Sequence, residues 1–129
     1  MTLSDLARAY LASIETDDQE AVFAFYHPDV VQEEYPNRLL AVGARRDFGE
    51  LRQAAQQGAA LMAEQRYEIN HLYECGQTVI IECSWTGRLA QVVPGLPADR
   101  SMRARFAVVL EYRDKLIWRQ RNYDCFEAW

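Results

Sequence analysis

The sequence predicts an α+β fold in which helices cover the concave face of a strongly curved antiparallel sheet. Apolar residues recur every three to four positions in the first half of the chain and every second position in the second half. These periods are typical of amphipathic helices and of strands with one buried face. The alternating segments are long and joined by short turns, which favours antiparallel pairing. A length of 129 residues suffices for a hydrophobic core, and we expect one domain, residues 1–129.

Two helices are expected near the start of the chain. Residues 3–15 carry apolar side chains at helical spacing, and Thr2 with Asp5 resembles a capping box. A second helix is expected to begin at Asp17 and to end at Pro28, because a proline disfavours helical backbone before it. The apolar residues of that helix are Val22, Phe25 and Tyr26.

A short strand over residues 30–35 and a third helix are expected next. Asp47 with Glu50 marks the start of this helix. Its apolar positions are Phe48, Leu51, Ala55, Ala59 and Met62. The period then changes to two, and four strands follow in a meander. They are expected over residues 67–74, 78–89, 102–113 and 116–126, with residues 93–97 in a longer loop.

Composition excludes several functional classes. The net charge of −5 and the pI of about 5.0 argue against a nucleic-acid surface, which needs excess lysine and arginine. No apolar run approaches the roughly 20 residues of a membrane helix, and the first residues do not resemble a secretory signal. Three widely spaced cysteines do not form a disulfide framework. We therefore expect a cytoplasmic protein that binds neither nucleic acid nor membranes.

The last strand carries the most informative alternation. One set of its side chains combines two aromatic rings, two amides and an acid, which is the usual composition of a small-molecule pocket. This set is Trp118, Gln120, Asn122, Asp124 and Phe126. The other set is expected on the convex face or at a dimer contact: Arg119, Arg121, Tyr123 and Cys125. Ordinary core packing, with the amides bonded to the backbone, is the alternative.

Glu34 and Asp124 could exchange protons with a bound molecule if both side chains point inward. Burial in an apolar pocket raises the pKa of a carboxyl group towards neutrality, which suits Glu34 and Asp124 to acid–base chemistry. Alternatively, Glu33 and Glu34 are solvated residues on an edge strand. Asp124 could also form a structural ion pair with an arginine of a neighbouring strand. The available arginines are Arg103, Arg105, Arg119 and Arg121.

Further aromatic residues are expected either in the pocket wall or in the core. They are Tyr10, Tyr26, Tyr35, Trp85 and Phe106. No metal or cofactor is expected, since His27 and His71 lie far apart and no glycine-rich phosphate loop is present.

The order and spacing of several motifs resemble the SnoaL-like branch of the nuclear transport factor 2-like superfamily. The resemblance runs nearly from end to end. Its motifs are Asp17-Asp18-Gln19-Glu20-Ala21, residues 25–31 (FYHPDVV), residues 33–37 (EEYPN), Ser84-Trp85-Thr86-Gly87, and residues 121–126 (RNYDCF) ahead of Trp129.

The resemblance implies a cone-shaped domain with a pocket for a small apolar ligand and dimers formed through the other sheet face. It implies that Tyr10 corresponds to the oxyanion-binding tyrosine of ketosteroid isomerases, and Glu34 to their proton-shuttling carboxylate. Tyr35 directly precedes the proline, so a shift of one residue would turn Glu33 and Tyr35 inward instead. Val108 falls where those isomerases carry a second carboxyl group, and Asp124 matches the acid–base aspartate of SnoaL-like cyclases.

Two functions follow as hypotheses. The first is a cofactor-independent isomerase, cyclase or hydrolase that acts by proton transfer on an apolar carbonyl compound. In this hypothesis Glu34 or Asp124 is the base and Tyr10 stabilises negative charge on oxygen. The second is a non-catalytic protein that binds a small molecule.

Overall fold

The computed structural model describes residues 1–16 and 18–129. Three helices and six strands follow one another along the chain in the order α1, α2, β1, β2, α3, β3, β4, β5, β6. Their bounds are α1 Leu3–Ile14, α2 Gln19–Phe23, β1 Tyr26–Glu34, β2 Ala44–Arg46, α3 Phe48–Leu61, β3 Met62–Cys75, β4 Thr78–Leu89, β5 Ser101–Arg113 and β6 Leu116–Phe126. The predicted α+β class is confirmed.

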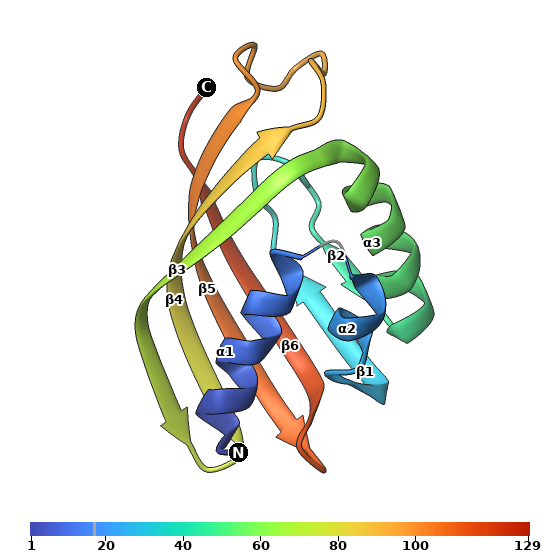
Figure 1. The fold of residues 1–129 in the computed structure, drawn as a ribbon, viewed down its shortest axis with the longest axis vertical. Helices are drawn as coiled ribbons and strands as arrows, with labels where there is room; N and C mark the ends of the chain where they lie inside the picture. Colours follow the sequence, from blue (N-terminus) through green and yellow to red (C-terminus); the bar gives the residue numbers. More distant parts are fainter. Residues whose placement is uncertain (17) are drawn as a thin grey trace.

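The six strands form one curved sheet in the order β2-β1-β6-β5-β4-β3 (Figure 1). Strands β3 to β6 form the expected antiparallel meander. Strand β1 runs parallel to β6, so one pair of the sheet departs from the antiparallel expectation. A parallel pair needs a long crossover, and here the chain from β1 to β6 passes through most of the fold.

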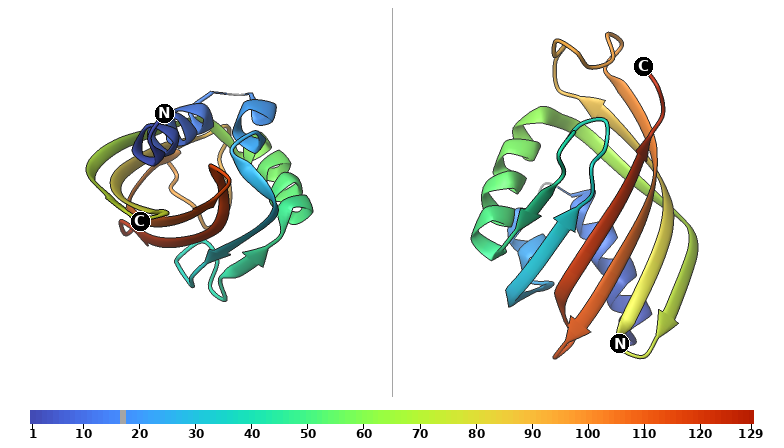
Figure 2. Two further views of the ribbon diagram at one scale, coloured as in Figure 1. Left: turned by 90° about the horizontal axis from the view of Figure 1, so that it is seen from below. Right: turned by 180° about the vertical axis from the view of Figure 1, so that it is seen from behind.

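Helix α1 lies across the hollow of the curved sheet, and α2 and α3 lie beside β1 (Figure 2). The predicted capping box fixes the start of α1, because the Thr2 side chain accepts from the Asp5 amide and Asp5 accepts from the Thr2 amide. The buried stripe of α1 consists of Ala7, Tyr10 and Leu11. These side chains pack in the main core with strand residues such as Ile81 and Leu110. We call the sheet face covered by α1 the inner face.

A second, smaller core cluster lies at one end of the inner face. It consists of Trp85, Leu89, Met102 and Ala104, with further partly buried apolar residues packed around it. The loop that joins β4 to β5 lies at this end, as does the chain end at Trp129 (Figure 1).

Several predicted boundaries need correction. Helix α2 ends at Phe23, and Tyr26 already begins β1, because the residue before Pro28 favours extended backbone. Phe25 and Tyr26 therefore do not belong to the helix. Met62 was expected on the third helix but begins β3, which starts five residues earlier than predicted.

The helix starts agree with the capping signals where they can be compared. The Asp47–Glu50 capping box is confirmed at α3. Asp17, expected to start the second helix, lies outside the described residues, and Asp18 caps α2 by accepting from the Ala21 amide. The short strand β2 was not predicted at all. In the part of the chain that the structure describes, no helix has the length and apolarity needed to cross a membrane.

Candidate functional site

Cross-strand rows bring the predicted polar residues together on the inner face. Glu34 of β1 pairs with Asn122 of β6, and Asp124 lies two residues further along β6, opposite Phe106 of β5. Side chains alternate between faces along a strand, and directly paired residues share a face. Glu34, Asn122 and Asp124 therefore line the same side of the sheet.

Asp124 is the unusual acid of this face. It is only partly exposed and sits beside the aromatic rings of Phe106 and Phe126. No ion pair to Asp124 occurs among residues 1–16 and 18–129, so none of the four proposed arginines neutralises it. Burial, followed by the charge of Glu34, raises the pKa of Asp124 to about 7.

Glu34 has a partner that the sequence did not suggest. Arg46, from the edge strand β2, places Nη1 3.2 Å from Oε1 of Glu34. The same nitrogen donates to Oε1 of Gln32 at 3.2 Å. Gln32 is Arg46's direct strand partner, so all three side chains lie on the inner face. Glu34 is thus held as the partner of a guanidinium, whereas Asp124 is not.

A chain of hydrogen bonds joins helix α1 to this row. The hydroxyl groups of Tyr10 and Tyr26 are 2.6 Å apart. The Gln120 amide lies next to the Tyr10 hydroxyl, at 3.3 Å for Nε2, and donates from Nε2 to Oδ1 of Asn122 at 3.0 Å. Tyr10 is only 2 % exposed, and burial raises its pKa above the usual value. Its hydroxyl is therefore occupied by protein partners.

Aromatic rings form the other wall of the inner face. Trp85 stacks on Phe106 at 5.4 Å between ring centroids, and Phe126 meets both rings edge-on. Tyr67 of β3 packs against Phe106 at 6.3 Å. Burial raises its pKa well above the usual value, with contributions from Asp124 and Glu34. Tyr67 was not among the predicted site residues, although its alternation with Ile69 would have indicated the buried face.

The structure shows which of Glu33, Glu34 and Tyr35 faces the inner side of the sheet. Glu33 bonds to Arg45, and the ring of Tyr35 packs against that of Tyr123 with 4.7 Å between the centroids. Both side chains therefore turn away from Glu34 towards the outer, convex face. The expectation that Tyr35 lines the pocket is wrong. Glu34 is the member of the trio on the inner face.

Simple alternation along the last strand also predicts the wrong face for Trp118. A bulge interrupts the β5–β6 ladder between the pairs Glu111–Arg119 and Tyr112–Ile117. An extra residue in one strand shifts the facing of its neighbours. Trp118 consequently lies between the guanidinium groups of Arg113 and Arg119, each 3.9 Å from its ring. It does not join Gln120, Asn122 and the residues that follow.

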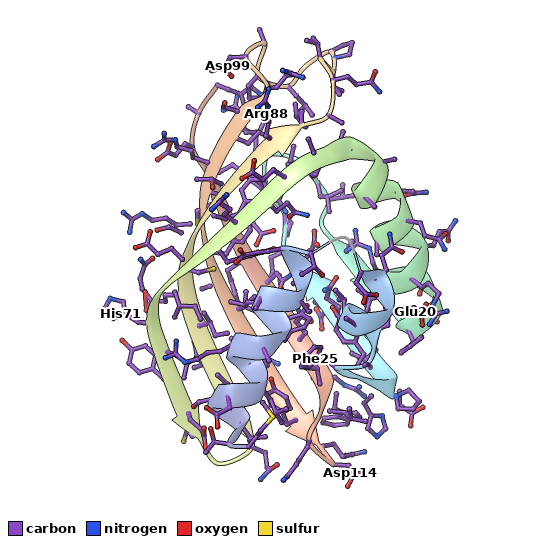
Figure 3. All side chains as sticks on the ribbon, viewed as in Figure 1. Glu20, Phe25, His71, Arg88, Asp99 and Asp114 are labelled. Carbon is purple, nitrogen blue, oxygen red and sulfur yellow. The ribbon has the colours of Figure 1, made fainter. Side chains whose placement is uncertain are left out.

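The outer face carries a shallow hollow of about 230 Å³ between β3, β4, β5 and β6. Small Ala107 lies among the larger side chains of His71, Glu82, Arg105 and Tyr123 there. Figure 3 shows His71 projecting from the outside of the sheet. This hollow is separate from the acids on the inner face.

Cysteine and metal chemistry find little support in the described part of the chain. The Cys83 thiol is buried, and burial raises its pKa to about 11, which disfavours the nucleophilic thiolate. Within residues 1–16 and 18–129, no cluster of three or more histidine, cysteine and acidic side chains could hold a metal ion.

The inner face therefore combines one paired acid, one unpaired acid with a pKa near neutrality, and a wall of aromatic rings. A carboxyl group with such a pKa can both accept and return a proton near pH 7. Val108, in the same row as Asn122, is apolar, so a second protonated carboxyl group does not stand there.

Comparison with known proteins identifies a matching protein family. The model of the SnoaL-like domain matches residues 7–120, a span that ends four positions before Asp124. Among the curated proteins no match was found. IdmH from Streptomyces antibioticus, described as a candidate polyketide cyclase, superposes with a TM-score of 0.80 at 18% identity, over 96% of this chain and 92% of that one.

Two further solved structures have the same fold. A protein from Catenulispora acidiphila with a ketosteroid isomerase-like fold, in complex with trimethylamine, has a TM-score of 0.75 at 19% identity, over 95% of this chain and 86% of that one. A phenazine biosynthesis-related protein from Pseudomonas aeruginosa has a TM-score of 0.73 at 16% identity, over 95% and 80%. At these identities the likeness establishes the fold alone.

Proposed function

The chain belongs to the SnoaL-like domain family, and from this premise we propose that its inner face binds a small, largely apolar carbonyl compound and that Asp124 exchanges a proton with it. The observation that carries the proposal is the unpaired Asp124 carboxyl group, set among aromatic rings, with its pKa raised to about 7. The polyketide cyclase-like neighbour supports this class of ligand.

The proposed step needs no cofactor. The ionised Asp124 takes a proton from the carbon next to a carbonyl group. The electron pair of that C–H bond forms a new carbon–carbon double bond, and the carbonyl π pair moves to oxygen, giving an enolate. An isomerase would return the proton from Asp124 to a different carbon. A cyclase would let the enolate carbon attack a second carbonyl group of the same molecule, and the proton of Asp124 would neutralise the alkoxide formed.

Asp124, and not Glu34, is the proton carrier in this proposal. Glu34 lies 3.2 Å from the Arg46 guanidinium, so its carboxylate is already engaged by a charge-assisted contact within the protein. Its fixed charge raises the pKa of Asp124. Glu34 therefore acts on the reaction through Asp124.

Deuterium exchange tests the proposal directly. The probe is 2-tetralone, an apolar bicyclic ketone with acidic C–H bonds next to its carbonyl, incubated in D₂O and followed by proton NMR. The unmodified chain should accelerate loss of these proton signals, and Asp124→Asn should lower the accelerated rate by about 100-fold or more. Asp114→Asn is the matched control. Asp114 is exposed in the turn between β5 and β6 (Figure 3), whereas Asp124 lies near the other end of β6. Equal exchange in the unmodified chain and Asp124→Asn would refute the role of Asp124.

A non-catalytic binding protein is the second candidate. The observation that favours it is the engagement of the Tyr10 hydroxyl by Tyr26 and Gln120, which removes the predicted donor for negative charge on oxygen. In this case 2-tetralone would raise the melting temperature progressively as its concentration increases, while its exchange rate stayed at the buffer value.

We also propose that two copies pair through the outer face. Partly exposed Tyr123 and Tyr73, at 44% and 53%, lie on this face together with Ile80, at 37%. Apolar groups exposed on an uncovered sheet face favour association.

A further inference from the structure

The described inner face contains a single positive group. Its strand residues all lie in the described part of the chain, and Arg46 is the only arginine or lysine among them. The side chain is largely buried, with 18% of its area exposed. Both of its contacts, to Glu34 and to Gln32, are made by Nη1. A guanidinium carries five N–H donors, so the hydrogens on Nε and Nη2 remain available.

The position of Arg46 relative to Asp124 suits a carbonyl group. Its guanidinium lies against Glu34, which stands beside Asn122 in the adjacent strand. Asp124 is two residues beyond Asn122, about 7 Å further along the strand. An oxygen bonded to Arg46 and a C–H group directed at Asp124 can therefore belong to one small molecule.

We propose that Arg46 binds the ligand's carbonyl oxygen and stabilises the negative charge that develops there, the role expected of Tyr10. This inference rests on the proposed function. Glu34 and Gln32 hold the guanidinium in place from one side, so its free donors are preorganised. As the proton moves from carbon to Asp124, the negative charge moves from the carboxylate to the oxygen facing Arg46. The site thus never gains net charge during the step.

The test compares the ionised and neutral forms of one ring system. All variants carry Asp124→Asn, which mimics the protonated acid. The probes are 2-naphthol, titrated across its ionisation, and 2-methoxynaphthalene, which cannot ionise. Arg46→Gln should weaken binding of the naphtholate by about tenfold or more and change the affinity for 2-methoxynaphthalene by less than about threefold. Arg46→Lys should restore part of the loss, since it keeps the charge.

Arg45→Gln is the matched control. Arg45 is the neighbour of Arg46 in β2 and also pairs with a glutamate, but on the outer face with 70% of its side chain exposed. It should leave both affinities unchanged. Equal weakening of both probes by Arg46→Gln, or no weakening of the naphtholate, would overturn the role of Arg46. Failure of either probe to bind in the Asp124→Asn background would instead refute the proposed ligand site, and this inference with it.

Discussion

Asp124 should leave a signature in the pH dependence of stability. Its pKa rises from 3.8 to about 7 on folding, so the folded state binds this proton more tightly than the unfolded state. Ionisation therefore costs folding free energy progressively as the pH rises from about 4 to about 7 and by a constant amount above that. Asp124→Asn should gain stability relative to the unmodified chain across this window, by up to about 4 kcal/mol. Urea denaturation at several pH values measures the difference, and a pH-independent difference would contradict the assignment.

Two buried tyrosines allow a matched comparison. The Tyr10 hydroxyl bonds to Tyr26 and Gln120, whereas the Tyr112 hydroxyl is buried without a partner among the described residues. Tyr10→Phe should cost about 1–3 kcal/mol, because buried partners are left unsatisfied. Tyr112→Phe should be neutral or stabilising, since it removes an unsatisfied group. Chemical denaturation of both variants measures the two values, and equal costs would contradict the hydrogen-bond chain.

The β1–β2 connection positions both Glu34 and Arg46, and Gly43 makes it possible. Gly43 adopts a φ of +69°, and a Cβ atom there would lie 2.5 Å from the carbonyl oxygen of Glu34. Gly76 has a similar φ of +59° but open space around it. Gly43→Ala should therefore cost more folding free energy than Gly76→Ala, for which we expect about 1 kcal/mol. Thermal denaturation compares the pair, and equal costs would argue against the close approach.

Local sequence patterns predict the starts of two helices, but they predict neither the short strand β2 nor the bulge in β6. The capping boxes at Thr2 and Asp47 are local and could be predicted. Strand β2 has three residues, too few for any period to be visible, so Arg46 was missed. The bulge that turns Trp118 outward depends on pairing with β5, and pairing is not encoded in the alternation of one strand.

At the scale of the whole molecule, the class of fold and much of the polar row could be predicted. Gln120, Asn122 and Asp124 share a face because a strand alternates strictly from Gln120 onward. The facing of Glu34 could not be predicted, since it depends on the register between β1 and β6 and a shift of one residue reverses it. The parallel pairing of these strands is likewise a property of the folded chain.

The proposed pairing of two copies is also tested at this scale. Tyr123→Glu places a charge on the outer face, while Val42→Glu does so on a loop position that is 91% exposed. The unmodified chain and Val42→Glu should sediment as dimers, and Tyr123→Glu should shift towards the monomer. Analytical ultracentrifugation measures this, and a monomeric unmodified chain at all concentrations would contradict the pairing.

The central claim is that the curved sheet and its helices keep one acid unpaired and poorly hydrated on the inner face. Carbon-13 NMR of the Asp124 carboxyl group tests it most directly, with Glu34→Gln alongside. We predict a midpoint at about pH 7 in the unmodified chain and a lower one in Glu34→Gln that stays above the usual range, because burial outweighs the charge of Glu34. A midpoint near 4 in the unmodified chain, as in a hydrated aspartate, would contradict the account.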